Sequence, residues 1–362
     1  MACSNADFSQ FSSVDAIGDA VRLTISQMSH RPALKLLAAL ASACLLSCVA
    51  AGGAGADPGG GAAVVSNRVI ADRTSVVDVF SPSMGRPIPV TVYRAANPEI
   101  PAPTLYLLNG AAGGDGGSSW FDRTDIAGFF GDQQVNVVVP TGGAASYYTD
   151  WYRDDPVLGR NQWATFLTRE LPAVVDAEFR GNGMNAIAGI SMAGTSVFQL
   201  ALAHPGFYTA AASYSGCAMT SDPLGRAYVK SVVEMRGRGN TLNMWGPDSD
   251  RAWTDNDPYV NAEKLRGTEL YISSGSGLPG PLDTIDGPDV NGSPGKLVEQ
   301  LAVGALIESA TDRCSRMMQA RLDSLGIPAT YNFRDNGTHS WGYWQGDLHD
   351  SWPLLARSLG VA

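Results

Sequence analysis

Short apolar runs alternate with helical segments along most of this chain, and this alternation is compatible with few protein folds. Leu105–Leu108 and Val135–Val139 are short apolar runs, as expected of parallel strands that are covered on both faces. Val76–Phe80 and Ile88–Tyr93 favour the two arms of an antiparallel pair. Later strands are expected at Ala186–Ala188, Ala210–Tyr214, Glu269–Ser274 and Thr330–Phe333, and helices at Trp163–Glu178 and Met192–His204. This order predicts an α/β fold with one mainly parallel central sheet and helices on both faces.

Two long stretches interrupt the alternation. Ala218–Leu265 separates two expected strands, and Gly275–Gly295 is rich in Gly, Pro and Asp. Long insertions between strands commonly build substrate pockets, so we expect the substrate to be bound near them.

The N-terminal part has the character of a targeting segment. His30, Arg31 and Lys35 precede the apolar run Leu36–Ala51, and Ala54-Gly55-Ala56 offers the small residues that a signal peptidase requires. The polar residues before Met28 do not resemble the start of a signal peptide, which favours Met28 as the true start. Residues 1–63 are therefore interpreted as leader, signal segment and Gly/Ala-rich linker, and residues 64–362 as one folded domain.

A second interpretation of the same segment is a lipoprotein signal. Leu45-Leu46-Ser47-Cys48 resembles a lipobox, in which an acylated Cys48 would attach the protein to the membrane. Either interpretation predicts a location outside the cytoplasmic membrane, secreted or in the cell envelope.

Charge and cysteine content narrow the function further. The net charge is −10 and no basic run follows the first forty residues, which argues against nucleic-acid binding. Three of the five cysteines fall in the leader, and the remaining two, Cys217 and Cys314, suggest one disulfide in an oxidising compartment. Two buried free thiols are the alternative. The cysteine spacing does not resemble a metal site.

The strongest local motif is Ala186 to Gly194, in which a small apolar strand meets Gly-Ile-Ser and then a helix. This is the layout of a nucleophile elbow with Ser191 as the nucleophile. The usual closing glycine is replaced by Ala193 and Gly194. A surface serine that happens to precede a helix is the alternative.

An activated serine needs a base, and the chain has four histidines. His30 lies in the leader, His204 ends a helix and His349 lies in a polar C-terminal helix. His339 follows the last expected strand, where an α/β-hydrolase carries its base. The acid should follow the strand that ends near Ser274, and chain order alone leaves five candidates open: Asp283, Asp286, Asp289, Glu299 and Glu308.

Two backbone N–H groups are expected to form the oxyanion hole. One belongs to Met192, directly after the nucleophile. The second is expected at Ala111, in the Gly-rich loop after Leu105–Leu108. A merely flexible Gly-rich loop is the alternative, and a phosphate loop is disfavoured because no Lys follows.

The chain resembles the mycolyltransferases of the antigen 85 family, which are esterase D-like α/β-hydrolases. The resemblance spans nearly the whole body after the leader. It is carried by motifs in the family's order: Ser81–Arg86, Pro140–Gly143 with Tyr148–Tyr152, Thr165–Pro172, the elbow, Met244–Pro247, Asn256–Pro258 and Gly337–Trp341. It implies that residues 64–362 form an α/β-hydrolase catalytic domain. The family carries its triad acid on a Leu-Glu segment before the His, and Ile307-Glu308-Ser309 fits, which implies Glu308.

The resemblance also implies a reaction. Ser191 would take a mycolyl group from trehalose monomycolate and pass it to a second trehalose monomycolate or to arabinogalactan, without a cofactor or a metal. Diacylglycerol acyl transfer or ester hydrolysis would be side activities. The expected partners are trehalose mycolates and cell-wall glycolipid. Sugar contacts are implied at Asn109, Ser340 and Trp341, although Trp341 and Trp344 could equally be core aromatics.

This chain departs from the family at one sugar-binding segment. Asn109 and Ala112 stand where the family commonly carries the Asp and Arg that help to hold trehalose. The acceptor could therefore differ. Two rival functions remain: a secreted carboxylesterase that uses water as the acceptor, and a non-catalytic binding protein.

Overall fold

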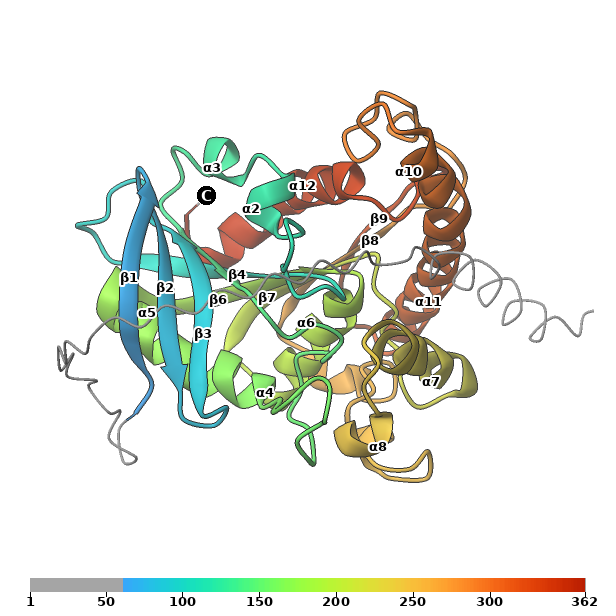
Figure 1. Ribbon diagram of the computed structural model, residues 1–362, viewed down its shortest axis with the longest axis horizontal. Coiled ribbons are helices and arrows are strands. Elements are labelled where there is room, and N and C mark those ends of the chain that lie inside the picture. Colours follow the sequence, from blue (N-terminus) through green and yellow to red (C-terminus); the bar gives the residue numbers. More distant parts are fainter. Residues whose placement is uncertain (1–60, 362) are drawn as a thin grey trace, which may run out of the picture. The chain divides into compact units, whose positions relative to one another are not determined.

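The computed structural model describes residues 61–361, so the signal segment and Cys48 lie outside the described residues. Its centre is a nine-stranded sheet of order β1-β2-β3-β5-β4-β6-β7-β8-β9 (Figure 1). The strands are β1 (Ala63–Ala71), β2 (Thr74–Ser81), β3 (Arg86–Tyr93), β4 (Ala102–Leu108), β5 (Asn136–Pro140), β6 (Gly181–Ile190), β7 (Tyr208–Tyr214), β8 (Glu269–Ser274) and β9 (Thr330–Phe333).

The first three strands form the antiparallel edge of the sheet. β2 pairs with β3 as expected from the sequence, and β3 pairs antiparallel with β5. The edge strand β1 was not expected. Most of its residues are exposed, so no buried face imposes the apolar alternation that identifies a strand. The predicted start of the folded body, Val64, is the second residue of β1.

The strands from β4 to β9 run parallel to one another. β4 and β5 are buried along their whole length, which explains their apolar sequences. The mainly parallel sheet predicted from the sequence is therefore confirmed. Because all these strands point the same way, the loops after them meet at one edge, where parallel sheets place their sites.

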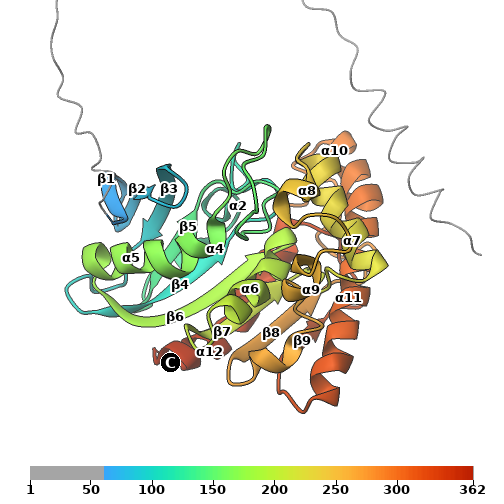
Figure 2. The same cartoon turned by 90° about the horizontal axis from the view of Figure 1, so that it is seen from below.

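Helices cover both faces of the sheet, as predicted (Figure 2). The α-helices are α2 (Trp120–Arg123), α3 (Ile126–Phe129), α4 (Trp163–Thr165), α5 (Leu171–Phe179), α6 (Met192–Ala203), α7 (Pro223–Lys230), α8 (Thr241–Met244), α9 (Ala252–Asp255), α10 (Pro294–Glu299), α11 (Ala305–Ser324) and α12 (Trp341–Leu359). The π-helical turns η1 (Phe166–Glu170), η2 (Ser231–Arg236) and η4 (Gln300–Gly304) and the 3₁₀ turn η3 (Ala262–Leu265) complete them.

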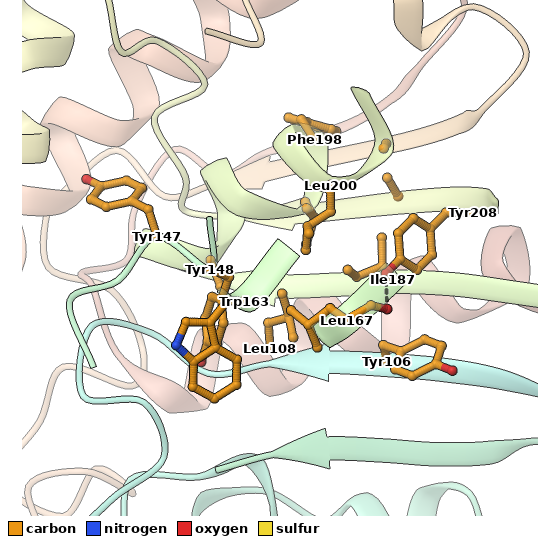
Figure 3. Close-up of a cluster of buried hydrophobic side chains, with 14 of the residues drawn as sticks. Tyr106, Leu108, Tyr147, Tyr148, Trp163, Leu167, Ile187, Phe198, Leu200 and Tyr208 are labelled. Carbon is orange, nitrogen blue, oxygen red and sulfur yellow. Dashed lines mark hydrogen bonds between the residues drawn. The ribbon is translucent and has the colours of Figure 1, made fainter. Parts of the chain in front are cut away.

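Alternate residues of β4 enter two different cores. Tyr106 and Leu108 pack with side chains of α5 and α6, whereas Leu105 and Leu107 pack with those of α2, α3 and α12. Figure 3 shows part of the first core, including the hydrogen bond from the Tyr208 hydroxyl to the Leu167 carbonyl (3.2 Å). Burial of both sheet faces holds the carboxyl ends of the strands rigidly in place.

The two insertions take different forms. Residues 218–265 carry α7, η2, α8, α9 and η3, whereas residues 275–293 form an irregular loop before α10. The helix expected over Trp163–Glu178 is present as α4, η1 and α5, with a π-helical segment in its middle.

Cys217 and Cys314 form a disulfide, with their Cα atoms 5.0 Å apart. The bond joins the loop after β7 to α11 and links positions 97 residues apart in the sequence.

Candidate active site

Ser191 lies at the sharp turn between β6 and α6. Its backbone has φ 56° and ψ −121°, a region that non-glycine residues rarely adopt. The Ser191 N–H donates to the Tyr214 carbonyl at the end of β7 (2.8 Å). A Cβ at Gly189 would lie 2.9 Å from the Ala193 Cβ, so only glycine allows the strand and the helix to meet this closely. The turn is a nucleophile elbow.

Gly194 fills the place of the elbow's closing glycine. A Cβ at Gly194 would lie 2.8 Å from the Gly216 Cα, in the loop after β7. The shift of one position relative to the usual motif therefore keeps the close contact between α6 and the next strand's loop.

The three predicted catalytic residues form one hydrogen-bonded chain. His339 Nε2 lies 2.8 Å from Ser191 Oγ, and His339 Nδ1 lies 2.7 Å from Glu308 Oε2. The side chains of His339 and Glu308 are 9% and 0% exposed. An imidazole between a hydroxyl and a carboxylate can take the hydroxyl's proton while the carboxylate orients the ring and stabilises its charge.

The other candidate acids have different positions. Asp283 accepts hydrogen bonds from the Thr338 hydroxyl and the Tyr343 hydroxyl, and Asp289 accepts one from the Trp341 N–H (2.7 Å). Both aspartates therefore hold the ends of the loop that carries His339. Glu299 and Asp286 are exposed. Of the five carboxylates that chain order left open, Glu308 is the one in contact with His339.

Ser215 holds Glu308 in place, a role that no sequence motif indicated. The Ser215 hydroxyl donates to Glu308 Oε1 (2.8 Å) and accepts from Trp344 Nε1 (2.9 Å). The Gly275 N–H donates to the same carboxylate oxygen (2.6 Å). Ser215 follows β7 at the carboxyl edge of the sheet, and that position was the available signal. Trp344 is a buried aromatic residue, as one of the two interpretations expected, but its indole N–H also supports this network.

A buried ion pair lies behind the Glu308 carboxylate. Arg334, just after β9, donates from Nη1 to Asp347 Oδ1 on α12, and its Nη2 lies 3.9 Å from Glu308 Oε1. The Asp347 side chain is 0% exposed. Burial raises the pKa of Asp347 to about 7, against the lowering effect of Arg334. Sequence patterns give no sign of this pair.

The loop after β4 passes directly beside Ser191. A Cβ at Gly110 would lie 3.4 Å from the Ser191 Cβ, and the Gly113 N–H closes a turn onto the Gly110 carbonyl (2.9 Å). The Ala111 carbonyl accepts from the Ala145 N–H (3.0 Å), which anchors the loop to the segment after β5. Met192 opens α6, where backbone N–H groups are free of helical partners. The two predicted oxyanion donors thus lie on segments that flank the nucleophile.

Asn109 has a different place from the one expected. Its side chain is fully buried, its Nδ2 donates to the Pro140 carbonyl (3.0 Å), and its Oδ1 accepts from the Trp120 N–H (3.2 Å). Both ends of the amide are occupied, so the side chain braces the loop and is not available to a sugar. The expectation of a substrate contact at Asn109 is corrected accordingly.

Trp341 and Ser340 follow His339 at the start of α12. Trp341 is half-buried and packs edge to face against Trp120 and Trp344, with ring centres 5.4 Å apart in each pair. Ser340 is the N-cap residue of α12 and is 6% exposed. These contacts show the structural role of both residues, and their contact with substrate stays a prediction.

A polar cavity of about 360 Å³ lies beside the loop after β4. Arg86 and Asp115 line it together with Thr141, and Pro89 and Leu158 supply apolar wall. Its lining includes Gly142, whose N–H donates to the Gly113 carbonyl of the loop after β4 (2.7 Å).

Within residues 61–361 no group of His, Cys, Asp and Glu side chains is arranged to hold a metal ion. The same part of the chain contains no helix that is both long and apolar enough to cross a bilayer.

Comparison with known proteins decides the family. The Esterase family model matches residues 81–355. The chain is 34% identical over 294 residues to diacylglycerol acyltransferase/mycolyltransferase Ag85A of Mycobacterium leprae, covering 79% of this chain and 83% of the relative. It is 33% identical to Ag85A of Mycobacterium tuberculosis, covering 79% and 81%. The chain belongs to the antigen 85 family.

Solved structures agree with this antigen 85 fold. Mycobacterium tuberculosis MPT51 (FbpC1) matches with a TM-score of 0.64 and 27% identity, covering 77% of this chain and 96% of that one. The S-formylglutathione hydrolase of Agrobacterium tumefaciens matches with a TM-score of 0.59 at 17% identity, covering 82% and 99%, and shows the fold alone. The predicted α/β-hydrolase fold is confirmed. Antigen 85 membership places the chain among the acyltransferases and esterases.

Proposed function

We propose that this protein is an exported serine acyltransferase that moves a mycolyl group from trehalose monomycolate to a second trehalose monomycolate or to cell-wall arabinogalactan. The observation that carries the proposal is the chain of hydrogen bonds from Ser191 through His339 to Glu308. The names of the Ag85A relatives, diacylglycerol acyltransferase/mycolyltransferase, support the acyl group and the transfer reaction.

In the first half-reaction, Ser191 Oγ attacks the ester carbonyl of the donor. His339 Nε2 takes the hydroxyl proton, and Glu308 stabilises the imidazolium that results. The N–H groups of Ala111 and Met192 are the proposed donors to the oxygen on which negative charge develops. When the tetrahedral intermediate collapses, His339 returns the proton to the departing sugar oxygen, and the acyl group remains on Ser191.

In the second half-reaction, a sugar hydroxyl of the acceptor replaces the leaving group. His339 takes its proton, the hydroxyl oxygen attacks the acyl-enzyme, and Ser191 recovers its proton as the ester is released. The reaction exchanges one ester for another, and it requires only proton transfer and stabilisation of the oxyanion. The triad and the proposed oxyanion donors supply these two kinds of catalysis. Transfer prevails over hydrolysis where the site excludes water.

The polar cavity beside the loop after β4 is the proposed place for a sugar ring. Arg86 and Asp115 can bond hydroxyl groups, while Pro89 and Leu158 offer apolar surface to the C–H face of a ring. These side chains would take over the recognition that Asn109, with its buried amide, cannot provide. Trp341 and Ser340 are proposed to contact the sugar nearer to His339.

Export is supported by the disulfide between Cys217 and Cys314, because disulfides persist in oxidising compartments. We propose cleavage of the leader after Ala56, with acylation of Cys48 as the competing outcome. The mass of the N-terminal peptide of the exported protein separates the two.

The decisive experiment incubates the purified protein with a labelled trehalose monoester and identifies the products. Trehalose diester together with a covalent acyl adduct on the wild type is the expected result, and Ser191→Ala should abolish both. Free acid as the sole product would assign a carboxylesterase instead. Absence of adduct and of turnover in the wild type would leave a binding function.

A further inference from the structure

The buried side chains behind the triad carry charges that nearly cancel. Glu308 and Asp347 are carboxylates, Arg334 is a permanent cation, and His339, as the proposed base, carries no charge before it takes a proton. All four lie in one connected set: Arg334 reaches both carboxylates, and Glu308 bonds His339. With Asp347 ionised, the set has a net charge of −1 at rest. It becomes neutral when His339 takes the proton of Ser191.

We propose that Arg334 and Asp347 are positioning residues that set the charge balance around Glu308, so that the catalytic imidazolium completes a neutral buried cluster. The inference rests on the proposed function in one respect only, the assignment of His339 as the base. Arg334 alone would compete with the imidazolium for the charge of Glu308. Asp347 draws Arg334 away, because their contact is shorter than the 3.9 Å between Arg334 and Glu308.

The geometry keeps Arg334 turned toward Asp347. Its guanidinium lies over the Tyr343 ring, 5.3 Å from the ring centre, and its backbone N–H donates to the Ser274 carbonyl (2.9 Å). Its Nε and Nη2 are buried without a hydrogen-bond partner among the described residues. An unpaired buried cation is costly, so Arg334 depends on these two carboxylates for its compensation.

Few other ionisable groups face the cluster. Tyr214 and Tyr271, on β7 and β8, lie near Asp347 as neutral phenols, because burial raises the pKa of both. Farther out, two carboxylates already have partners. Asp312 on α11 accepts hydrogen bonds from Ser274 and Arg316. Asp350 on α12 accepts one from Asn332.

The test is the acid limb of the pH profile of kcat/KM for a p-nitrophenyl ester, which reports the pKa of the free enzyme's base. Asp347→Asn keeps the shape of the side chain but removes a negative charge, so the limb should move to lower pH by about one unit. Arg334→Met removes a positive charge close to Glu308, so the limb should move to higher pH.

Opposite shifts separate this role from a structural one, because loss of packing would lower the rate in both variants without moving the limb in opposite directions. The double variant Arg334→Met/Asp347→Leu removes both charges and should bring the limb back toward the wild-type position. Asp350→Asn, on the exposed side of the same helix, is the matched control and should leave the limb unmoved.

A second readout does not depend on activity. The imidazole titration of His339, followed by NMR and assigned by its loss in His339→Gln, should shift in the same directions in the two single variants. If both readouts give wild-type midpoints in Asp347→Asn and Arg334→Met, the proposal is overturned. If the wild type cleaves no ester, the base assignment fails, whereas the NMR titration still decides the charge balance.

Discussion

The Glu308 carboxylate has a donor on each oxygen, and this arrangement defines its role. Oε1 accepts from Ser215 and from the Gly275 N–H, so Oε2 is the oxygen that faces His339 Nδ1. With Nδ1 protonated, Nε2 is free to accept the proton of Ser191. The donors to one oxygen therefore select the tautomer of the base that the reaction needs.

Glu308→Gln tests this selection of tautomer. An amide NH₂ in place of Oε2 would favour the tautomer with the proton on Nε2, which cannot accept from Ser191. We expect kcat to fall by about 10³- to 10⁴-fold with the fold retained, measured by p-nitrophenyl ester hydrolysis and circular dichroism. Glu299→Gln, an exposed candidate of the same residue type, is the control. A loss in Glu308→Gln of less than tenfold would reject Glu308 as the triad acid.

Arg86→Met tests the proposed sugar cavity. Loss of a charged hydrogen-bond donor should raise KM for a trehalose ester by about tenfold, with a smaller effect on kcat. The KM for a p-nitrophenyl ester should change less, because that substrate lacks the sugar. Arg68→Met, on the exposed strand β1, serves as the control. An unchanged KM for the trehalose ester in Arg86→Met would place the sugar elsewhere.

Among the elements, α11 positions the acid, and the disulfide fixes that helix. Cys314 is on α11 with Glu308, and Cys217 is two residues after Ser215, so one bond ties both sides of the Ser215–Glu308 contact. The Ser315 hydroxyl also donates to the Gly216 carbonyl (3.2 Å). We therefore expect the position of Glu308 in the triad to depend on whether the Cys217–Cys314 disulfide is formed.

Removal of the disulfide should weaken both stability and activity. Cys217→Ser/Cys314→Ser opens a loop of 97 residues, so we expect a loss of about 2–4 kcal/mol in the free energy of unfolding. We also expect kcat to fall while KM changes little. Urea unfolding and ester hydrolysis measure the two effects. Full activity in the variant at temperatures where it stays folded would show that the disulfide stabilises the fold alone.

Contact between α6 and the loop after β7 allows a matched pair of glycine substitutions. Gly194→Ala would bring a methyl group against the Gly216 backbone, so the melting temperature should fall and Ser191 should be displaced, with loss of activity. Gly346, in α12, has no atom near its added Cβ, so Gly346→Ala should stabilise slightly through helix propensity. Equal melting temperatures in the two variants would contradict the close approach at the elbow.

For the molecule as a whole, the sequence predicted most of the sheet but only part of the site. β8 and β9 have the predicted bounds, because their apolar runs end at clear polar or glycine residues. β1 was missed because its faces are largely exposed. Ser191 and His339 were found from local motif and chain order. Glu308 required the family resemblance, and Ser215, Arg334 and Asp347 come together only through the tertiary fold.

The free energy of unfolding of the whole domain should depend on pH because of the buried Asp347. Its pKa is about 7 in the folded protein, above the ordinary value of 3.8. Between these two pH values the folded protein keeps a proton that the unfolded chain has released, so raising the pH from about 4 to about 7 destabilises the fold. The contribution to stability is fully present below pH 4 and is lost as the pH rises through 7.

Asp347→Asn cannot ionise, so its free energy of unfolding should rise relative to that of the wild type across this window. Urea unfolding at pH 4.5, 6.0 and 7.5 measures the difference. A difference that stays constant with pH would mean that Asp347 ionises alike in the folded and unfolded chains, which would contradict the effect of burial on its pKa.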